Sequence, residues 1–168
     1  MSNGPFSIVP PAPPAIVVTS PNGSEQLLIG LEYEITWTTY GNIDEVNLEY
    51  STDNGDTWET IAEYVPNMDS FQWIVSAPQS ENCLIRVSEI DGEPYDVSNE
   101  VFAVVPAPTI TVTSPNGGET LEAGSSHNIT WNSTGSLDCI RVEYSQDNGE
   151  TWTIIIDSAP NNGNYQWN

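Results

Sequence analysis

Two acidic turn segments are the residues of this chain best suited to bind an ion. They read Asp53-Asn54-Gly55-Asp56 and Asp147-Asn148-Gly149-Glu150. Calcium takes carboxylate and carbonyl oxygens, and turns of this composition supply both. Neither segment follows the EF-hand spacing, so the sequence predicts no cofactor, with calcium as the alternative. The candidate calcium ligands are Asp53, Asp56, Asp147 and Glu150.

Nucleophilic and acid–base catalysis have little support in the sequence. The single histidine, His127, aligns with Tyr33 across an internal repeat, so a catalytic histidine would occur in one copy only. Neither a Ser/His/Asp nor a Cys/His arrangement can be built around it with a recurring spacing. Two cysteines and one histidine also argue against a zinc site. We therefore predict that the protein is not an enzyme.

Both cysteines are predicted to be free thiols. Cys83 alternates with the apolar residues of its segment and reads as a small buried side chain. Cys139 precedes the inward-facing Ile140 and is expected to point outward. A disulfide between them would require opposite faces of two domains to meet.

The charge balance excludes two classes of partner. The chain has 24 acidic and 2 basic side chains among 168 residues, and its formal net charge is -22. Such a surface cannot neutralise a phosphate backbone, so we predict no binding to nucleic acid or to anionic membranes. The sequence has no apolar run long enough for a membrane-spanning helix, so we predict no direct membrane insertion. An apolar content of 38% still favours packed domains over disorder.

An internal repeat organises the chain. Residues 16–74 align without gaps on residues 110–168, and the six tryptophans fall into three matched pairs. The pairs are Trp37 and Trp131, Trp58 and Trp152, and Trp73 and Trp167. This pattern indicates a duplicated structural core rather than six separate sites.

The repeat and the prolines set the expected domain boundaries. Proline-rich stretches favour extended, semi-rigid spacers between repeats. We expect the terminal strand of a preceding repeat at 1–10, a linker at 11–15, a complete repeat at 16–105, a linker at 106–109 and a second, C-terminally truncated repeat at 110–168.

Alternating apolar residues predict the fold class. Short segments of period 2 are separated by Gly, Asn, Asp and Pro turns, and no segment has helical periodicity. Strands are expected near 57–63, 71–75 and 97–105, among others. About seven short strands in about 90 residues favour an all-β protein of tandem immunoglobulin-like antiparallel sandwiches.

The most specific local signal is the Asp-box pattern S-x-D-x-G-x-T-W, which occurs once in each repeat. Asn-Gly supplies the positive φ of a tight hairpin, the aspartate can accept hydrogen bonds from turn amides, and the tryptophan can cover the turn. We predict a structural hairpin in preference to a ligand-contacting one. Its residues are Ser51, Asp53, Gly55 and Trp58, and Ser145, Asp147, Gly149 and Trp152.

Together these motifs resemble a family of bacterial extracellular immunoglobulin-like repeats, related to a domain named after a yeast cell-wall glucan-synthesis protein. The matching segments include Ser114–Glu119, Ile129–Trp131 and Tyr144–Trp152, while Ser24 departs from the usual second glycine. The resemblance covers nearly the whole chain and carries no catalytic residue to transfer. It implies a secreted or surface-anchored protein whose repeats act as stalks, spacers or adhesive elements.

The leading prediction is therefore a non-catalytic extracellular repeat, used as a stalk, surface filament or spacer of a larger protein. Its expected partners are neighbouring repeats, in a homopolymer or with other surface proteins, and glycans. The alternative is a carbohydrate-binding accessory module of a secreted hydrolase, with Tyr40, Tyr64 and Tyr95 as candidate sugar-stacking residues. Three N-glycosylation acceptor patterns begin at Asn22, Asn128 and Asn132.

Overall fold

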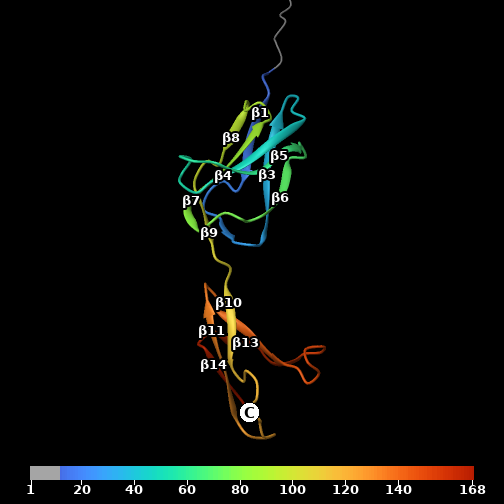
Figure 1. Ribbon diagram of the computed structural model, residues 1–168, viewed down its shortest axis with the longest axis vertical. Helices are drawn as coiled ribbons and strands as arrows, with labels where there is room; N and C mark the ends of the chain where they lie inside the picture. Colours follow the sequence, from blue (N-terminus) through green and yellow to red (C-terminus); the bar gives the residue numbers. More distant parts are fainter. Residues whose placement is uncertain (1–11) are drawn as a thin grey trace, which may run out of the picture. The chain divides into compact units, whose positions relative to one another are not determined.

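The computed structural model describes residues 12–168, which form strands and turns arranged in two compact units, 12–106 and 107–168 (Figure 1). The strand expected at 1–10 lies outside the described residues. Among residues 12–168, no helical segment has the length and apolarity that a bilayer crossing requires.

The first unit consists of two sheets. One contains β1 (Ala15–Ser20), β3 (Glu32–Tyr40) and β6 (Ser70–Ile74), in the order β1-β3-β6. The other has the order β2-β9-β7-β4-β5, with β8 beside β7. Its strands are β2 (Gln26–Leu28), β4 (Glu45–Ser51), β5 (Glu59–Pro66), β7 (Ser80–Glu89), β8 (Tyr95–Val97) and β9 (Phe102–Val105). Strands β2 and β9 pair in parallel, whereas the other paired strands of this unit are antiparallel.

The inward residues of both sheets form one apolar core. Ile35, Leu48 and Ile85 have no exposed surface, and they come from β3, β4 and β7. Trp37 is 2% exposed, and its indole N–H donates to Asn67 Oδ1 at 2.8 Å. A buried indole needs such an acceptor because an unpaired polar group costs free energy in the core. The prediction of an all-β sandwich is confirmed.

Two details of the strands differ from the sequence expectation. The single strand expected at 97–105 is divided into β8 and β9. The Ser98 hydroxyl explains the interruption, because it accepts from the Ile85 amide at 3.0 Å and donates to the Pro21 carbonyl at 2.7 Å. The short strand β2 has no alternating pattern long enough to be recognised, and it forms by pairing with β9.

The second unit repeats only part of this arrangement. One sheet contains β10 (Thr109–Ser114), β11 (His127–Thr134) and β14 (Asn164–Trp167), and the other contains β12 (Cys139–Tyr144) and β13 (Thr153–Pro160). The tryptophan contact recurs, since the Trp131 indole donates to Asn161 Oδ1 at 2.7 Å. Among residues 12–168, β12 pairs with β13 alone, whereas its counterpart β4 pairs with β5 on one edge and β7 on the other.

Candidate functional site

The Asp-box hairpin of the first unit is a closed network of hydrogen bonds. The Ser51 hydroxyl donates to Asp53 Oδ1 at 2.7 Å and accepts from the Gly55 amide at 2.8 Å. Thr57 then donates to the same carboxylate twice, from its amide to Oδ1 at 2.8 Å and from its hydroxyl to Oδ2 at 2.5 Å. Asn54 and Gly55 have φ of 61° and 93°, which the Asn-Gly pair tolerates.

The second hairpin reproduces the first bond for bond. The Ser145 hydroxyl donates to Asp147 Oδ1 at 2.7 Å, and the Gly149 amide donates to the Ser145 hydroxyl at 2.8 Å. Thr151 donates to Asp147 from its amide at 2.8 Å and from its hydroxyl at 2.5 Å. Identical geometry in two units indicates that residues within the hairpin determine it.

These contacts hold both aspartates in their charged form. The Thr57 hydroxyl, with the Thr57 amide and the Ser51 hydroxyl, lowers the pKa of Asp53 to about 2. The Thr151 hydroxyl leads the same set of donors at Asp147 and lowers its pKa to about 2. Hydrogen bonds donated to a carboxylate favour its ionised form. Both carboxylates therefore act as acceptors within their own turns.

Half of the candidate calcium ligands already use their carboxylate oxygens in hydrogen bonds within the hairpins. Both carboxylate oxygens of Asp53 and of Asp147 already accept hydrogen bonds from their own hairpins. Asp56 and Glu150 are exposed. Within residues 12–168, no group of three or more His, Cys, Asp or Glu side chains is placed to hold a metal ion. Calcium binding stays a prediction for these four residues.

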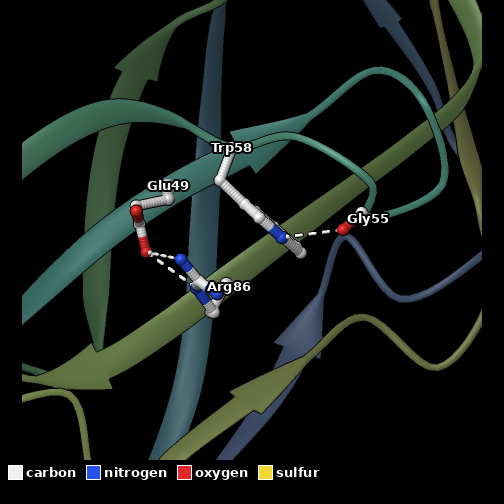
Figure 2. Close-up of polar contacts among 4 residues, drawn as sticks. All are labelled: Glu49, Gly55, Trp58 and Arg86. Atoms are coloured by element: carbon white, nitrogen blue, oxygen red, sulfur yellow. Dashed lines mark hydrogen bonds and ion pairs between the residues drawn. The ribbon is translucent and has the colours of Figure 1, made fainter.

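A charged cluster beside the first hairpin links β4, β7 and the turn, and sequence reasoning missed it. Figure 2 shows Arg86 between Glu49 and Trp58, with Arg86 Nη2 2.6 Å from Glu49 Oε2. The guanidinium carbon lies 4.5 Å from the centroid of a Trp58 ring, and the Trp58 indole donates to the Gly55 carbonyl at 3.1 Å. Its only sequence signal was that Arg86 is one of two basic residues in the chain.

This cluster lies at a polar groove of about 400 Å³ on the outer face of the larger sheet. Tyr95 is 51% exposed at the groove and offers a ring face beside carboxylate, amide and guanidinium groups. Such a surface can form hydrogen bonds with a polar ligand and stack on a flat one. The lining residues are Asn47, Glu49, Thr60, Glu63, Arg86, Ser88, Ile90, Asp91, Gly92 and Tyr95.

The three tyrosines proposed to stack on sugars do not share one surface. Tyr95 belongs to the groove, whereas Tyr40 ends β3 in the other sheet. Tyr64 lies on β5 and is 63% exposed. Of the glycosylation acceptors, Asn128 and Asn132 are exposed, and Asn22 accepts from the Asn99 amide at 2.6 Å.

The cysteines and the histidine occupy structural positions. Cys83 is 1% exposed, Cys139 is exposed, and both are free thiols as predicted. Burial raises the pKa of the Cys83 thiol, which disfavours the reactive thiolate. His127 is partly buried on β11, and its Nε2 atom has no hydrogen-bond partner among the described residues.

No protein-family model matches the chain, and the search of curated proteins finds no match. Among solved structures, the chain is similar to the fibronectin(III)-like modules of CbhA from Clostridium thermocellum. The identity is 19%, the alignment covers 90% of this chain and 77% of that chain, and the TM-score is 0.35.

Proposed function

We propose that this chain is a non-catalytic extracellular repeat that transmits tension as part of a stalk, surface filament or spacer. The side chains best suited to react or to bind an ion make structural contacts instead, which supports a non-catalytic role. Asp53 and Asp147 are held by their own turns, and Cys83 is buried. The features shared by both units are therefore hairpins and core contacts.

The single observation that carries this proposal is the parallel pairing of β2 with β9. Strand β9 is the last strand of the first unit and β2 is its second, after β1, and they pair from Gln26 with Ala103 to Leu28 with Val105. The Ala103 amide donates to the Glu25 carbonyl at 2.9 Å, and the Ile29 amide donates to the Val105 carbonyl at 2.9 Å. Tension applied at the two ends of the unit would shear this ladder, so its bonds would share the load rather than break one by one.

Single-molecule stretching of the full chain tests the proposal. We expect the first unit to unfold at a higher force when it is pulled from positions 12 and 106 than when it is pulled from positions within β4 and β5, whose antiparallel ladder opens from one end. Ala103→Pro removes one of the shearing bonds and should lower the end-to-end unfolding force. Equal forces in the two pulling directions would overturn the mechanical role.

The extracellular part of the proposal has its own test. Antibodies raised against the chain should detect it on intact cells of the source organism, and brief protease treatment of those cells should remove the signal. A signal that appears only after lysis would exclude the surface role.

The groove supports a second candidate function, a carbohydrate-binding accessory module. Tyr95 presents an exposed ring, while Asn47 and Glu63 supply the amide and carboxylate groups that hydrogen-bond to hydroxyls. A glycan array followed by titration calorimetry tests this function. Binding should be lost in Tyr95→Ala and kept in Tyr40→Ala, which alters the other sheet. Absence of any hit on the array would remove the candidate.

A further inference from the structure

A buried hydroxyl at the polar groove lacks a hydrogen-bond partner among residues 12–168. Three serines of the first unit are buried, Ser51, Ser88 and Ser98. The hydroxyls of Ser51 and Ser98 donate to Asp53 Oδ1 and to the Pro21 carbonyl. The Ser88 hydroxyl forms no such bond within the described part of the chain, although Ser88 is only 5% exposed. A buried polar group without a partner costs free energy, and a ligand in the groove can supply the missing bond.

The fold places Ser88 on the floor of this groove. Its neighbour Val87 enters the core, so the Ser88 side chain points to the opposite face of the sheet, where the groove lies. Asn47 of β4 and Tyr95 of β8 lie directly opposite Ser88 on its two sides. Asn47 Oδ1 accepts from the Tyr64 amide at 3.0 Å, which leaves the NH2 group of Asn47 to donate. Three polar side chains on adjacent strands, which are about 4.8 Å apart, therefore form one row.

The groove also has more carboxylates than its own cation can neutralise. The basic residue of its lining, Arg86, is already paired with Glu49 at 2.6 Å. Glu63 and Asp91 are exposed at the groove, and within residues 12–168 neither forms an ion pair. Two carboxylates beside the row of polar groups favour a ligand with positive charge and disfavour an acidic one.

In the second unit, the equivalent carboxylate is neutralised by an internal arginine. The counterparts of Asn47 and Glu63 are Arg141 and Asp157. Arg141 Nε donates to Asp157 Oδ1 at 2.6 Å, so that carboxylate has a cationic partner within the unit. In the first unit, asparagine in place of arginine leaves Glu63 available to a cation from outside.

A peptide fits this face less well than a sugar chain does. The facing backbone groups of β4, β7 and β8 are paired with one another, so an added strand has no ladder to join. Among the described residues that line the groove, Ile90 is the one aliphatic side chain. Hydroxyl, amide and aromatic groups instead match the hydroxyls and flat faces of sugars.

We propose that the groove of the first unit binds a glycan that carries free amino groups. This inference rests on the second candidate function, glycan binding at the groove, and names its ligand class. Ser88 and Asn47 form hydrogen bonds with sugar hydroxyls, and Tyr95 stacks on a sugar ring. The protonated amino groups of the glycan face Glu63 and Asp91.

Titration calorimetry of the full chain with three sugar hexamers tests the ligand class. The probes are hexamers of glucosamine, N-acetylglucosamine and galacturonic acid, which are cationic, neutral and anionic at mildly acidic pH. At low ionic strength, we expect the glucosamine hexamer to bind about tenfold more tightly than the N-acetylglucosamine hexamer, and the anionic hexamer not to bind. Added salt should reduce this preference, because it screens exposed charges.

The outcomes separate this inference from the function on which it rests. Equal affinity for the cationic and neutral hexamers would overturn the amine preference and leave glycan binding in place. Binding of none of the hexamers up to about 1 mM would remove both. A pentalysine peptide that binds more tightly than every sugar would make a basic protein the partner, which also overturns the inference.

Matched variants assign the residues. Ser88→Ala should weaken binding of the cationic and neutral hexamers about fivefold, while stability in urea stays the same or rises, because an unpaired buried hydroxyl is removed. Lower stability with unchanged binding would show that Ser88 has a structural role instead. Glu63→Gln combined with Asp91→Asn should bring the two affinities together, whereas Asp157→Asn in the second unit should leave their ratio unchanged. An unchanged ratio in the double variant would contradict the assigned carboxylates.

Discussion

The same two apolar residues occur at equivalent positions of β1 and β10, in very different surroundings. Ile16 and Val18 of β1 are 5% and 2% exposed, while Ile110 and Val112 of β10 are 47% and 46% exposed. Each pair lies in the same register against its neighbouring strand, β3 or β11. The difference comes from the facing sheet, which contains β2, β9, β7, β4 and β5 in the first unit and, among residues 12–168, β12 and β13 alone in the second. Burial of a strand is thus determined by what faces it.

Contacts made within the strands and turns that both units contain behave in the opposite way. The Asp-box hairpin runs from Ser51 to Trp58, and its bonds are the same in both units. The contact of Trp37 with Asn67 also recurs as Trp131 with Asn161, within 0.1 Å. These contacts use only strands that both units contain. The comparison therefore separates features that need the complete sandwich from features that do not.

The largest expected difference concerns the β1 and β10 core positions. Ile16→Ala should destabilise the first unit by about 2–5 kcal/mol, because it leaves a cavity in a packed core. Ile110→Ala should destabilise the second by less than about 1 kcal/mol, since the side chain is already half exposed. Hydrogen exchange at β3 and β11 under increasing urea measures each unit separately. Equal losses would mean that the β10 face is covered in solution.

The arginines provide the next contrast. Arg86→Ala removes the ion pair with Glu49 and the contact with the Trp58 ring. The side chains of Arg86 and Glu49 are 30% and 24% exposed, so the loss should lower the free energy of unfolding by about 1 kcal/mol. Arg141→Ala removes a pair that is 54% and 69% exposed, and should cost no more than about 0.5 kcal/mol. Urea denaturation of both variants gives the two values. Arg86→Lys is the control, because it keeps the charge and loses the planar contact with Trp58.

The sequence was sufficient for features that are encoded locally or periodically. Alternation predicted the all-β sandwich, the inward Cys83 and the outward Cys139. The bounds of β8 and β9 were missed because a tertiary contact, the Ser98 hydroxyl with Pro21 and Ile85, ends one strand before the next begins.

The polar groove and the position of Arg86 beside it could not be predicted from the sequence, because they also depend on contacts between residues far apart in the chain. Glu49, Trp58 and Arg86 meet only because β4 and β7 pair in one register, although Arg86 is 37 residues from Glu49. Pairing across such a separation is set by packing of the whole sandwich, and a shift of one residue would reverse the faces. Tyr95 joins the groove through the pairing of β8 with β7.

A smaller effect is expected at Tyr50, which donates to Glu59 Oε2 at 2.6 Å. Burial, followed by the hydrogen bond to Glu59, raises the pKa of Tyr50 to about 12. Tyrosine in an unfolded chain titrates near about 10, so this contribution to stability is present below pH 10 and is lost as the pH rises towards 12. Ultraviolet absorbance of the phenolate during alkaline titration checks the value.

Two variants sharpen this test. Tyr50→Phe should remove the late-titrating phenol and so identify it. Glu59→Gln should lower the pKa of Tyr50 while leaving it above 10, because burial remains the larger cause. The second unit has Thr153 where the first has Glu59, so it lacks this carboxylate acceptor. A Tyr50 pKa unchanged in Glu59→Gln would contradict the assigned hydrogen bond.

The smallest expected difference between the units is at the Asp-box aspartates. The pKa of Asp53 and that of Asp147 are each lowered to about 2, whereas aspartate in an unfolded chain titrates near about 3.9. Their contribution to stability is therefore present above pH 4 and is lost as the pH falls towards 2. Asp53→Asn and Asp147→Asn should each reduce, by a similar amount, the loss of stability of their own unit as the pH falls from 4 towards 2. Hydrogen exchange at the amides of Thr57 and Thr151 measures this change. A large effect in the first unit alone would show that the hairpin depends on the complete sandwich and is not held by its own residues.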